Sequence, residues 1–169
     1  MNHTALLRIG VGVALTLATA CSPAPPTPPP AEAATTSPQT PAPTQRRVIS
    51  TPDAPAAIGP YSQAIQVGQT LYLAGQIALD PVSGEMVTGG IEAETRQVME
   101  NLGAVLEAAG FGFGDVVQSQ VFLTNLDNFG AMNGVYGSYL GEGAPARATV
   151  GVAALPRGAL VEILMTAAR

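Results

Sequence analysis

Proline is spread so unevenly along this 169-residue chain that it limits where a folded domain can lie. Nine of the 15 prolines fall within residues 22–45, and Ala, Thr, Ser and Gln make up nearly all the rest of that segment. Such a segment buries too little apolar surface to offset the entropy lost on ordering. We expect a disordered tether, which at about 3.1 Å per residue would reach roughly 70 Å. Residues 46–169 then form one domain, large enough to bury a core without disulfides.

The first 21 residues have the pattern of an export signal. Arg8 and the terminal amine precede an uncharged apolar run over residues 9–20, which is too short to span a bilayer comfortably. The run ends in small residues directly before Cys21, as in a bacterial lipobox, where the cysteine is lipidated and becomes the first residue of the mature protein. We therefore expect residues 1–21 to be a lipoprotein-type signal peptide.

The destination follows from the residues around Cys21. Ala18 stands where the lipobox favours Leu, and Ser22 stands where an Asp would favour retention at the inner membrane. We expect an exported, periplasmic protein that meets a membrane only through a lipid on Cys21, with the outer membrane favoured. Cleavage after Ala20 to release a soluble secreted protein and an uncleaved anchor are the alternatives.

The ionisable side chains exclude several kinds of catalysis. His3 and Cys21 are the only His and Cys, and the chain has no Lys. Residues 46–169 therefore cannot supply Ser-His-Asp or Cys-His nucleophiles, lysine Schiff bases, or zinc sites built on Cys or His. The chain after the signal carries six Arg against 12 acidic residues, a formal charge of −6. Such a surface repels phosphates and argues against a nucleic-acid partner.

Hydrophobic periodicity and turn residues predict six strands and two helices. The strands are expected over 46–50, 64–67, 70–78, 116–124, 146–155 and 160–167, and the helices over 91–109 and 127–140. Strands flank each helix, which implies β-α-β crossovers with both helices on one face of a mixed sheet. The opposite face needs cover, and in so small a chain other subunits are the economical source. We therefore expect an oligomer.

Two lone charges in the last strands are candidates for a site. Arg147 lies in the sequence APARATVGV and Glu162 lies in LVEILMTAA, each among apolar neighbours. A structural Arg–Glu pair, or edge-strand charges that block aggregation, would explain them. Alternatively, a guanidinium can grip a carboxylate through two hydrogen bonds, and a partly desolvated Glu has a raised pKa and exchanges protons with water near neutrality. Together they suit hydrolysis of a small anionic substrate without a metal.

Four stretches carry a resemblance that covers residues 50–169 in order. They are APAAIGPYSQAIQVG (54–68), LYLAGQIALDPVSGE (71–85), the run from ETRQVMENLG to NFGAMNGVY (94–136), and PARATVGVAALPRGALVEI (145–163). The domain resembles the RidA/YjgF/YER057c/UK114 family. The resemblance implies a chorismate-mutase-like α+β fold, a six-stranded mixed sheet with two helices on one face. It also implies a homotrimer whose sheets form a central barrel, with active sites in the clefts between subunits.

The resemblance also implies an activity. The best-understood family members are enamine/imine deaminases, which hydrolyse 2-aminoacrylate and related 2-imino acids to 2-oxo acids and ammonia without a cofactor or metal. The Arg of the PAR motif is Arg147, which would bind the substrate carboxylate. Glu162 in the last strand would position and activate the attacking water and help to protonate the leaving ammonia. Non-catalytic binding of small carboxylates, a chaperone-like role, and the endoribonuclease activity attributed to some members are the alternatives.

Three further site residues are implied by the resemblance. Tyr61 of GPYSQ would wall the pocket, Gly75 of AGQI would offer backbone contacts, and Asn133 of the second helix matches a family position near the cleft. Without the resemblance, these residues would be interpreted as ordinary packing, a bulge glycine and a helix-surface residue.

The chain departs from the family pattern at three places. Thr149 stands where deaminases often carry Cys, although it would keep the backbone groups that bind substrate. Ala74 stands where Ser is common, and the loop 141–144 is about three residues shorter than in the archetypes. Because that loop is expected near the cleft, substrate size or preference is expected to differ.

Overall fold

A computed structural model describes residues 45–169, so the predictions for the signal, for Cys21 and for nearly all of the tether lie outside the described residues. The described chain forms six strands and two α-helices. Their bounds are β1 Arg46–Ile49, β2 Ala64–Val67, β3 Thr70–Leu73, α1 Ile91–Ala108, β4 Val116–Leu123, α2 Phe129–Ser138, β5 Ala146–Gly151 and β6 Val161–Ala168.

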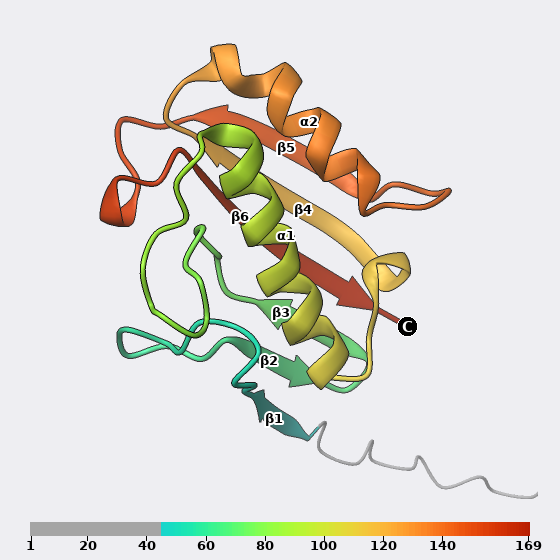
Figure 1. The fold of residues 1–169 in the computed structure, drawn as a ribbon. Helices are drawn as coiled ribbons and strands as arrows, with labels where there is room; N and C mark the ends of the chain where they lie inside the picture. Colours follow the sequence, from blue (N-terminus) through green and yellow to red (C-terminus); the bar gives the residue numbers. More distant parts are fainter. Residues whose placement is uncertain (1–44) are drawn as a thin grey trace, which may run out of the picture. The chain divides into compact units, whose positions relative to one another are not determined.

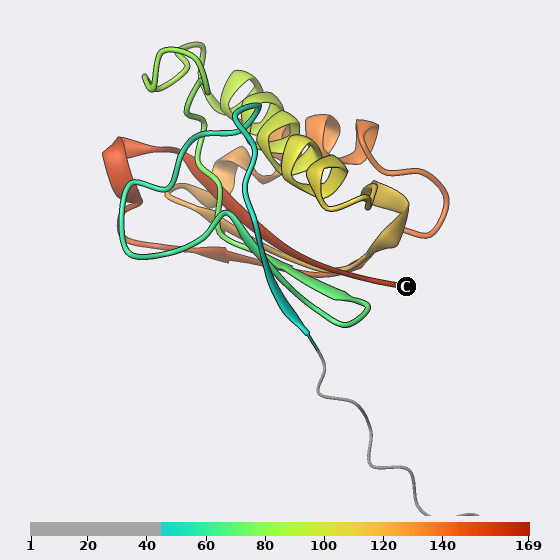
Figure 2. The same cartoon turned by 90° about the horizontal axis from the view of Figure 1, so that it is seen from below.

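The strands form one mixed sheet in the order β1-β2-β3-β6-β4-β5. Only β4 and β5 pair in parallel, and the other neighbours are antiparallel. Both helices lie on the same face, and no other part of residues 45–169 covers the opposite face of the sheet (Figures 1 and 2). The predicted α+β class and the β-α-β crossovers are therefore confirmed: α2 connects the adjacent strands β4 and β5, and α1 connects β3 to β4 across β6.

The core lies between α1 and the central strands. Val98, Leu102 and Val105 recur at helical spacing and are completely buried. Val121 of β4 and Ile163 of β6 are also fully buried, and they belong to the same apolar cluster. Each buried side chain of this size contributes about 1.5–3 kcal/mol to folding, so this layer fixes where β4 and β6 lie.

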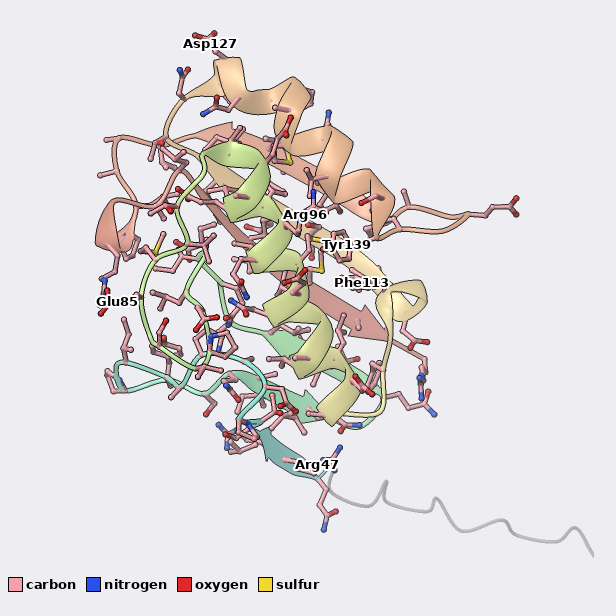
Figure 3. All side chains as sticks on the ribbon, in the orientation of Figure 1. Arg47, Glu85, Arg96, Phe113, Asp127 and Tyr139 are labelled. Atoms are coloured by element: carbon pink, nitrogen blue, oxygen red, sulfur yellow. The ribbon has the colours of Figure 1, made fainter. Side chains whose placement is uncertain are left out.

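The end of α2 contacts α1 and the 3-10 turn that begins at Phe113. Tyr139, which follows α2, makes an edge-to-face contact with Phe113 at a centroid distance of 5.7 Å. Its hydroxyl donates to the Arg96 backbone carbonyl at 3.5 Å (Figure 3). Met132 and Tyr136 of α2 are buried in the same core cluster, so α2 packs on the sheet as well as on α1.

Two of the predicted strands were too long. The third strand ends at Leu73 rather than Ala78, and only Gln76 pairs again, as a bridge to Ile163. The fifth strand ends at Gly151 rather than Leu155. Gly75 lies in this interruption, where a Cβ would overlap the Glu162 carboxylate and the pairing with β6 moves by one residue, from Tyr72–Thr166 to Gln76–Ile163.

The second helix is also shorter than predicted. It spans Phe129–Ser138 instead of 127–140 and is preceded by a single 3-10 turn over Leu126–Asn128. Asn125 caps that turn, because its side-chain oxygen accepts a hydrogen bond from the Asp127 amide at 3.0 Å. The remaining bounds agree with prediction to within one residue.

Candidate functional site

The two lone charges emerge on opposite faces of the sheet. In β4, Ser119 is the partner of Arg147 and Phe122 is the partner of Glu162. Residues an odd number apart in one strand point to opposite faces. Ser119 is buried on the helix side, so Arg147 points to the helix side and Glu162 to the uncovered face.

A structural Arg147–Glu162 pair is therefore not formed within one chain. Among residues 45–169 the ion pairs join Arg157 to Glu85 and Arg169 to Asp115. The edge-strand interpretation fits Arg147 only, because β5 is at the edge of the sheet while β6 is central. Glu162 needs another explanation.

Glu162 borders a hollow with a volume of about 330 Å³. Tyr61 and Gly75, two of the predicted site residues, line the same hollow, and so does Ala74. The rest of the wall is almost entirely apolar and comprises Pro55, Ala56, Ile58, Ile77, Leu79 and Pro156, with Gln76 as the polar exception. The structure thus brings together three of the residues that the resemblance implied.

The environment of Glu162 suits proton transfer. Its carboxylate accepts no hydrogen bond from any residue that the structure describes, and burial raises its pKa above the usual 4.5. The absence of a side chain at Gly75 leaves the space that the carboxylate occupies. A half-buried carboxylate without a partner is available to bind and deprotonate a water molecule.

Tyr61 is held by its own loop. Its hydroxyl accepts a hydrogen bond from the Ile58 amide at 3.3 Å, and 49% of its surface is exposed. The loop is anchored by Gln63, which is 3% exposed and was not singled out from the sequence. The Gln63 amide donates to the carbonyls of Thr51, Ala54 and Pro55 at 2.9–3.0 Å, and its oxygen accepts from the Thr51 amide at 2.7 Å. The signal was present in the GPYSQ motif, which ends on this residue.

Arg147 borders a second, shallower hollow beside α2. Asn133 and Tyr136 of α2 line it, together with Gly141 and Ala144 of the shortened loop. The Arg147 Cζ atom lies 4.7 Å from the centroid of the Tyr136 ring and 5.7 Å from that of Phe129. Sequence reasoning missed both rings, although Phe129, Asn133 and Tyr136 have the spacing of one helix face.

Thr149 lies on the same side of β5 as Arg147, two residues further along the strand. Its hydroxyl is buried and has no hydrogen-bond partner among the described residues; the same holds for the hydroxyls of Ser119 and Tyr136. The predicted site residues therefore separate into two groups. Glu162, Tyr61 and Gly75 form the Glu162 half-site, and Arg147, Asn133 and Thr149 form the Arg147 half-site.

Residues 45–169 contain neither a metal-binding cluster nor a membrane-spanning helix. No group of three or more His, Cys, Asp or Glu side chains in this part of the chain is arranged to hold a metal ion. No helix in it is long and apolar enough to cross a membrane.

Comparison with known proteins gives consistent results. The family model described as Endoribonuclease L-PSP matches residues 51–169. The mouse 2-iminobutanoate/2-iminopropanoate deaminase is 53% identical over 118 residues, which are 70% of this chain and 87% of that protein. The crystal structure of RidA from a Psychrobacter species is 46% identical with a TM-score of 0.71, over 73% of this chain and 99% of that one. The structure of Escherichia coli TdcF with bound serine is 35% identical with a TM-score of 0.69, over 73% and 98%.

Proposed function

This chain belongs to the endoribonuclease L-PSP family, of which RidA is a member, and from that premise we propose that it hydrolyses 2-imino acids and their enamine tautomers to 2-oxo acids and ammonia. The observation that carries the proposal is the 53% identity to a 2-iminobutanoate/2-iminopropanoate deaminase across nearly the whole domain. Arg147 and Glu162 supply the two chemical groups that the reaction needs, and each borders a hollow.

The reaction divides between the two half-sites. The Arg147 guanidinium binds the substrate carboxylate through two parallel hydrogen bonds. Glu162 takes a proton from water as its oxygen attacks the C=N carbon, and then returns that proton to the nitrogen. This gives a carbinolamine, which carries a hydroxyl and an amino group on the same carbon. The hydroxyl proton then passes through Glu162 to the nitrogen, the C–N bond breaks as the C=O bond forms, and ammonia leaves, so the carbonyl oxygen of the 2-oxo acid comes from the water. An enamine is first protonated at carbon to give the imine.

The active site would be shared between copies of the chain. Since Arg147 and Glu162 point to opposite faces of one sheet, a single chain cannot present both to one small substrate. An Arg147 half-site from one copy against the Glu162 half-site of the next would do so, as in the homotrimer implied by the family resemblance. The uncovered sheet face carries exposed apolar side chains for such contacts, among them Val48, Tyr72 and Val150.

A coupled assay tests the activity. An amino-acid oxidase generates the imine in place, and semicarbazide traps whatever has not been hydrolysed. The wild-type chain should deplete the imine, while Arg147→Ala and Glu162→Ala should each reduce the rate at least ~100-fold, towards the uncatalysed level. Arg96→Ala and Glu107→Ala remove exposed charges of the same kind from α1 and should keep full activity.

Other outcomes would favour the alternatives. If the wild-type chain only matches the blank but binds a small carboxylate, the protein is a binding member of the family. Ribonuclease activity, suggested by the description of the family model, is opposed by the charge of −6 after the signal and by the lack of Lys. Tight RNA binding at physiological salt would reverse that preference.

The location is a separate proposal. We propose that the protein is exported and held at the outer membrane by a lipid on Cys21, with residues 22–45 as the tether; the sequence pattern supports this. Its imine would then come from a local source, such as an amino-acid oxidase or dehydrogenase at the membrane. Fractionation should find the wild type with membranes and Cys21→Ser in the soluble fraction, whereas a wild-type protein in the cytosol would overturn the proposal.

A further inference from the structure

The Arg147 guanidinium is held by two aromatic rings of α2. Its Cζ atom lies 4.7 Å from the centroid of Tyr136 and 5.7 Å from that of Phe129, both within the range of a cation–π contact. The two aromatic residues are seven positions apart in α2, so they stand two helical turns apart on one face. Arg147 reaches them from β5, a different element at the edge of the sheet.

The Arg147 guanidinium has cation–π contacts with these two rings but no polar partner among the described residues. Arg147 takes part in neither of the ion pairs found among residues 45–169, and its guanidinium donates no hydrogen bond to them. A guanidinium held through the faces of aromatic rings keeps its N–H donors free in its own plane. The donors that would grip a carboxylate are therefore unoccupied while the group is already placed.

The two rings differ in their surroundings. Tyr136 is 4% exposed, and its buried hydroxyl has no hydrogen-bond partner among the described residues. Tyr136 therefore contacts the Arg147 guanidinium through its ring and not through its hydroxyl. Phe129 is 41% exposed, so its ring lies at the surface beside the guanidinium. An exposed Phe at that place adds little to the core and can be replaced without creating a large cavity.

We propose that Phe129 and Tyr136 are positioning residues that preorganise Arg147 for the carboxylate of the substrate. Together they set how strongly the site prefers a 2-imino acid over an uncharged imine. This inference rests on the proposed function for its substrate, but its physical content is the affinity of the Arg147 half-site for a carboxylate. Loss of a ring should weaken carboxylate binding and leave the chemical step at Glu162 unchanged.

The test uses Phe129→Leu and Tyr136→Leu in the full chain, with Tyr136→Phe as the variant that keeps the ring. Phe111→Leu is the matched control, because the Phe111 ring packs on Arg169 rather than on Arg147. We expect KM for the 2-imino acid to rise roughly 3- to 10-fold in each Leu variant with kcat nearly unchanged. Tyr136→Phe and the control should resemble the wild type.

A binding measurement separates this proposal from the proposed function. Calorimetry compares 2-oxobutanoate with 2-oxobutanamide, which lacks the charge. The Leu variants should lose most of the wild-type preference for the acid, and in an Arg147→Leu background the change Phe129→Leu should have no further effect. If the wild type binds the acid without turnover and the preference still falls, the deaminase proposal fails and the positioning role stands. An unchanged preference in folded Phe129→Leu, or no preference in the wild type, overturns the positioning role.

Discussion

Glu162 illustrates how one residue is prepared by what surrounds it. Its carboxylate is half-buried, it has no partner among the described residues, and its pKa is raised by burial. Gly75 contributes by having no side chain, since a Cβ there would overlap the carboxylate. The charged form of Glu162 is therefore destabilised in the fold, which makes it a stronger base than an exposed Glu.

The pH dependence of the reaction should reflect the raised pKa of Glu162. A base must be ionised to accept a proton, so kcat/KM is expected to rise with pH through the Glu162 pKa and to reach its plateau above it. The midpoint should lie above 4.5, the usual value for Glu. The profile is measured in the trapping assay, and Glu162→Gln should lose the acid limb together with the activity. A wild-type midpoint at or below the usual value would contradict this account of the base.

The same shift predicts the effect of Glu162 on stability. Because its pKa is higher in the folded than in the unfolded chain, the protonated form contributes stability that is present below the unfolded pKa and is lost as pH rises through the folded pKa. Glu162→Gln stays neutral and should therefore have a higher Tm than the wild type at neutral pH. The difference should vanish below about pH 4, where the wild-type carboxyl is also neutral.

At the scale of elements, the loop before β2 depends on one buried amide. Gln63 connects three backbone carbonyls and one backbone amide of the segment from Thr51 to Pro55, which leads into the part of the loop that carries Ile58 and Tyr61. The loop has no strand or helix of its own between β1 and β2, so this side chain takes the place of a regular ladder. The wall of the Glu162 half-site is therefore held in position by a residue that does not line it.

Gln63→Leu should consequently affect both stability and activity. It keeps much of the volume but leaves three carbonyls without their donor, so we expect the free energy of unfolding to fall by about 1–3 kcal/mol. Deaminase activity should fall as well, because Tyr61 loses its fixed position. Denaturant unfolding and the trapping assay measure the two effects. Gln69→Leu, in the exposed turn between β2 and β3, is the control and should stay within about 0.5 kcal/mol of wild type.

At the scale of the whole molecule, the uncovered sheet face and the separated charges have one common explanation. The face opposite the helices carries exposed apolar side chains, and the two half-sites lie on different sides of the same sheet. Assembly of several copies would cover the apolar sheet face and would bring the Arg147 half-site of one copy against the Glu162 half-site of another. A monomer would leave the apolar face in water and the reaction without one of its two groups.

Mixed assemblies test this directly. Arg147→Ala and Glu162→Ala chains should each be inactive alone, but co-expressed chains should regain up to about one third of wild-type activity, since each mixed trimer contains one site with both residues intact. Light scattering after size exclusion gives the mass of the assembly. Two differently tagged Arg147→Ala chains are the control and should regain nothing. If mixed trimers form and the mixture is still inactive, the proposal of a site shared between chains is contradicted.

Much of the architecture was predictable because it is encoded by near neighbours in the chain. The periodicity from Ile91 onward predicted α1 to within one residue, since which face of a helix is apolar depends only on local spacing. Hydrophobic patterning predicted β4 and β6 to within a residue. The lack of Lys, and of His and Cys beyond residue 21, limited the chemistry to carboxylates, Arg, Tyr, hydroxyls and backbone groups. Arg147 and Glu162 were already candidates as lone charges among apolar neighbours, and the resemblance added Tyr61, Gly75, Asn133 and Thr149.

Tertiary structure decided how those residues are grouped. That Arg147 and Glu162 lie on opposite faces follows from the pairing of both strands with β4, and such a register joins residues far apart in the chain. The fold also places Gly75, which has no side chain, beside the Glu162 carboxylate from a distant segment. The rings behind Arg147 meet it because α2 packs over β5. By itself the sequence determined the helices and strands, which depend on local spacing, and the available chemistry, which depends on the residue types present. The tertiary structure decided how the site residues divide into two half-sites, because contacts between distant segments form only in the folded chain.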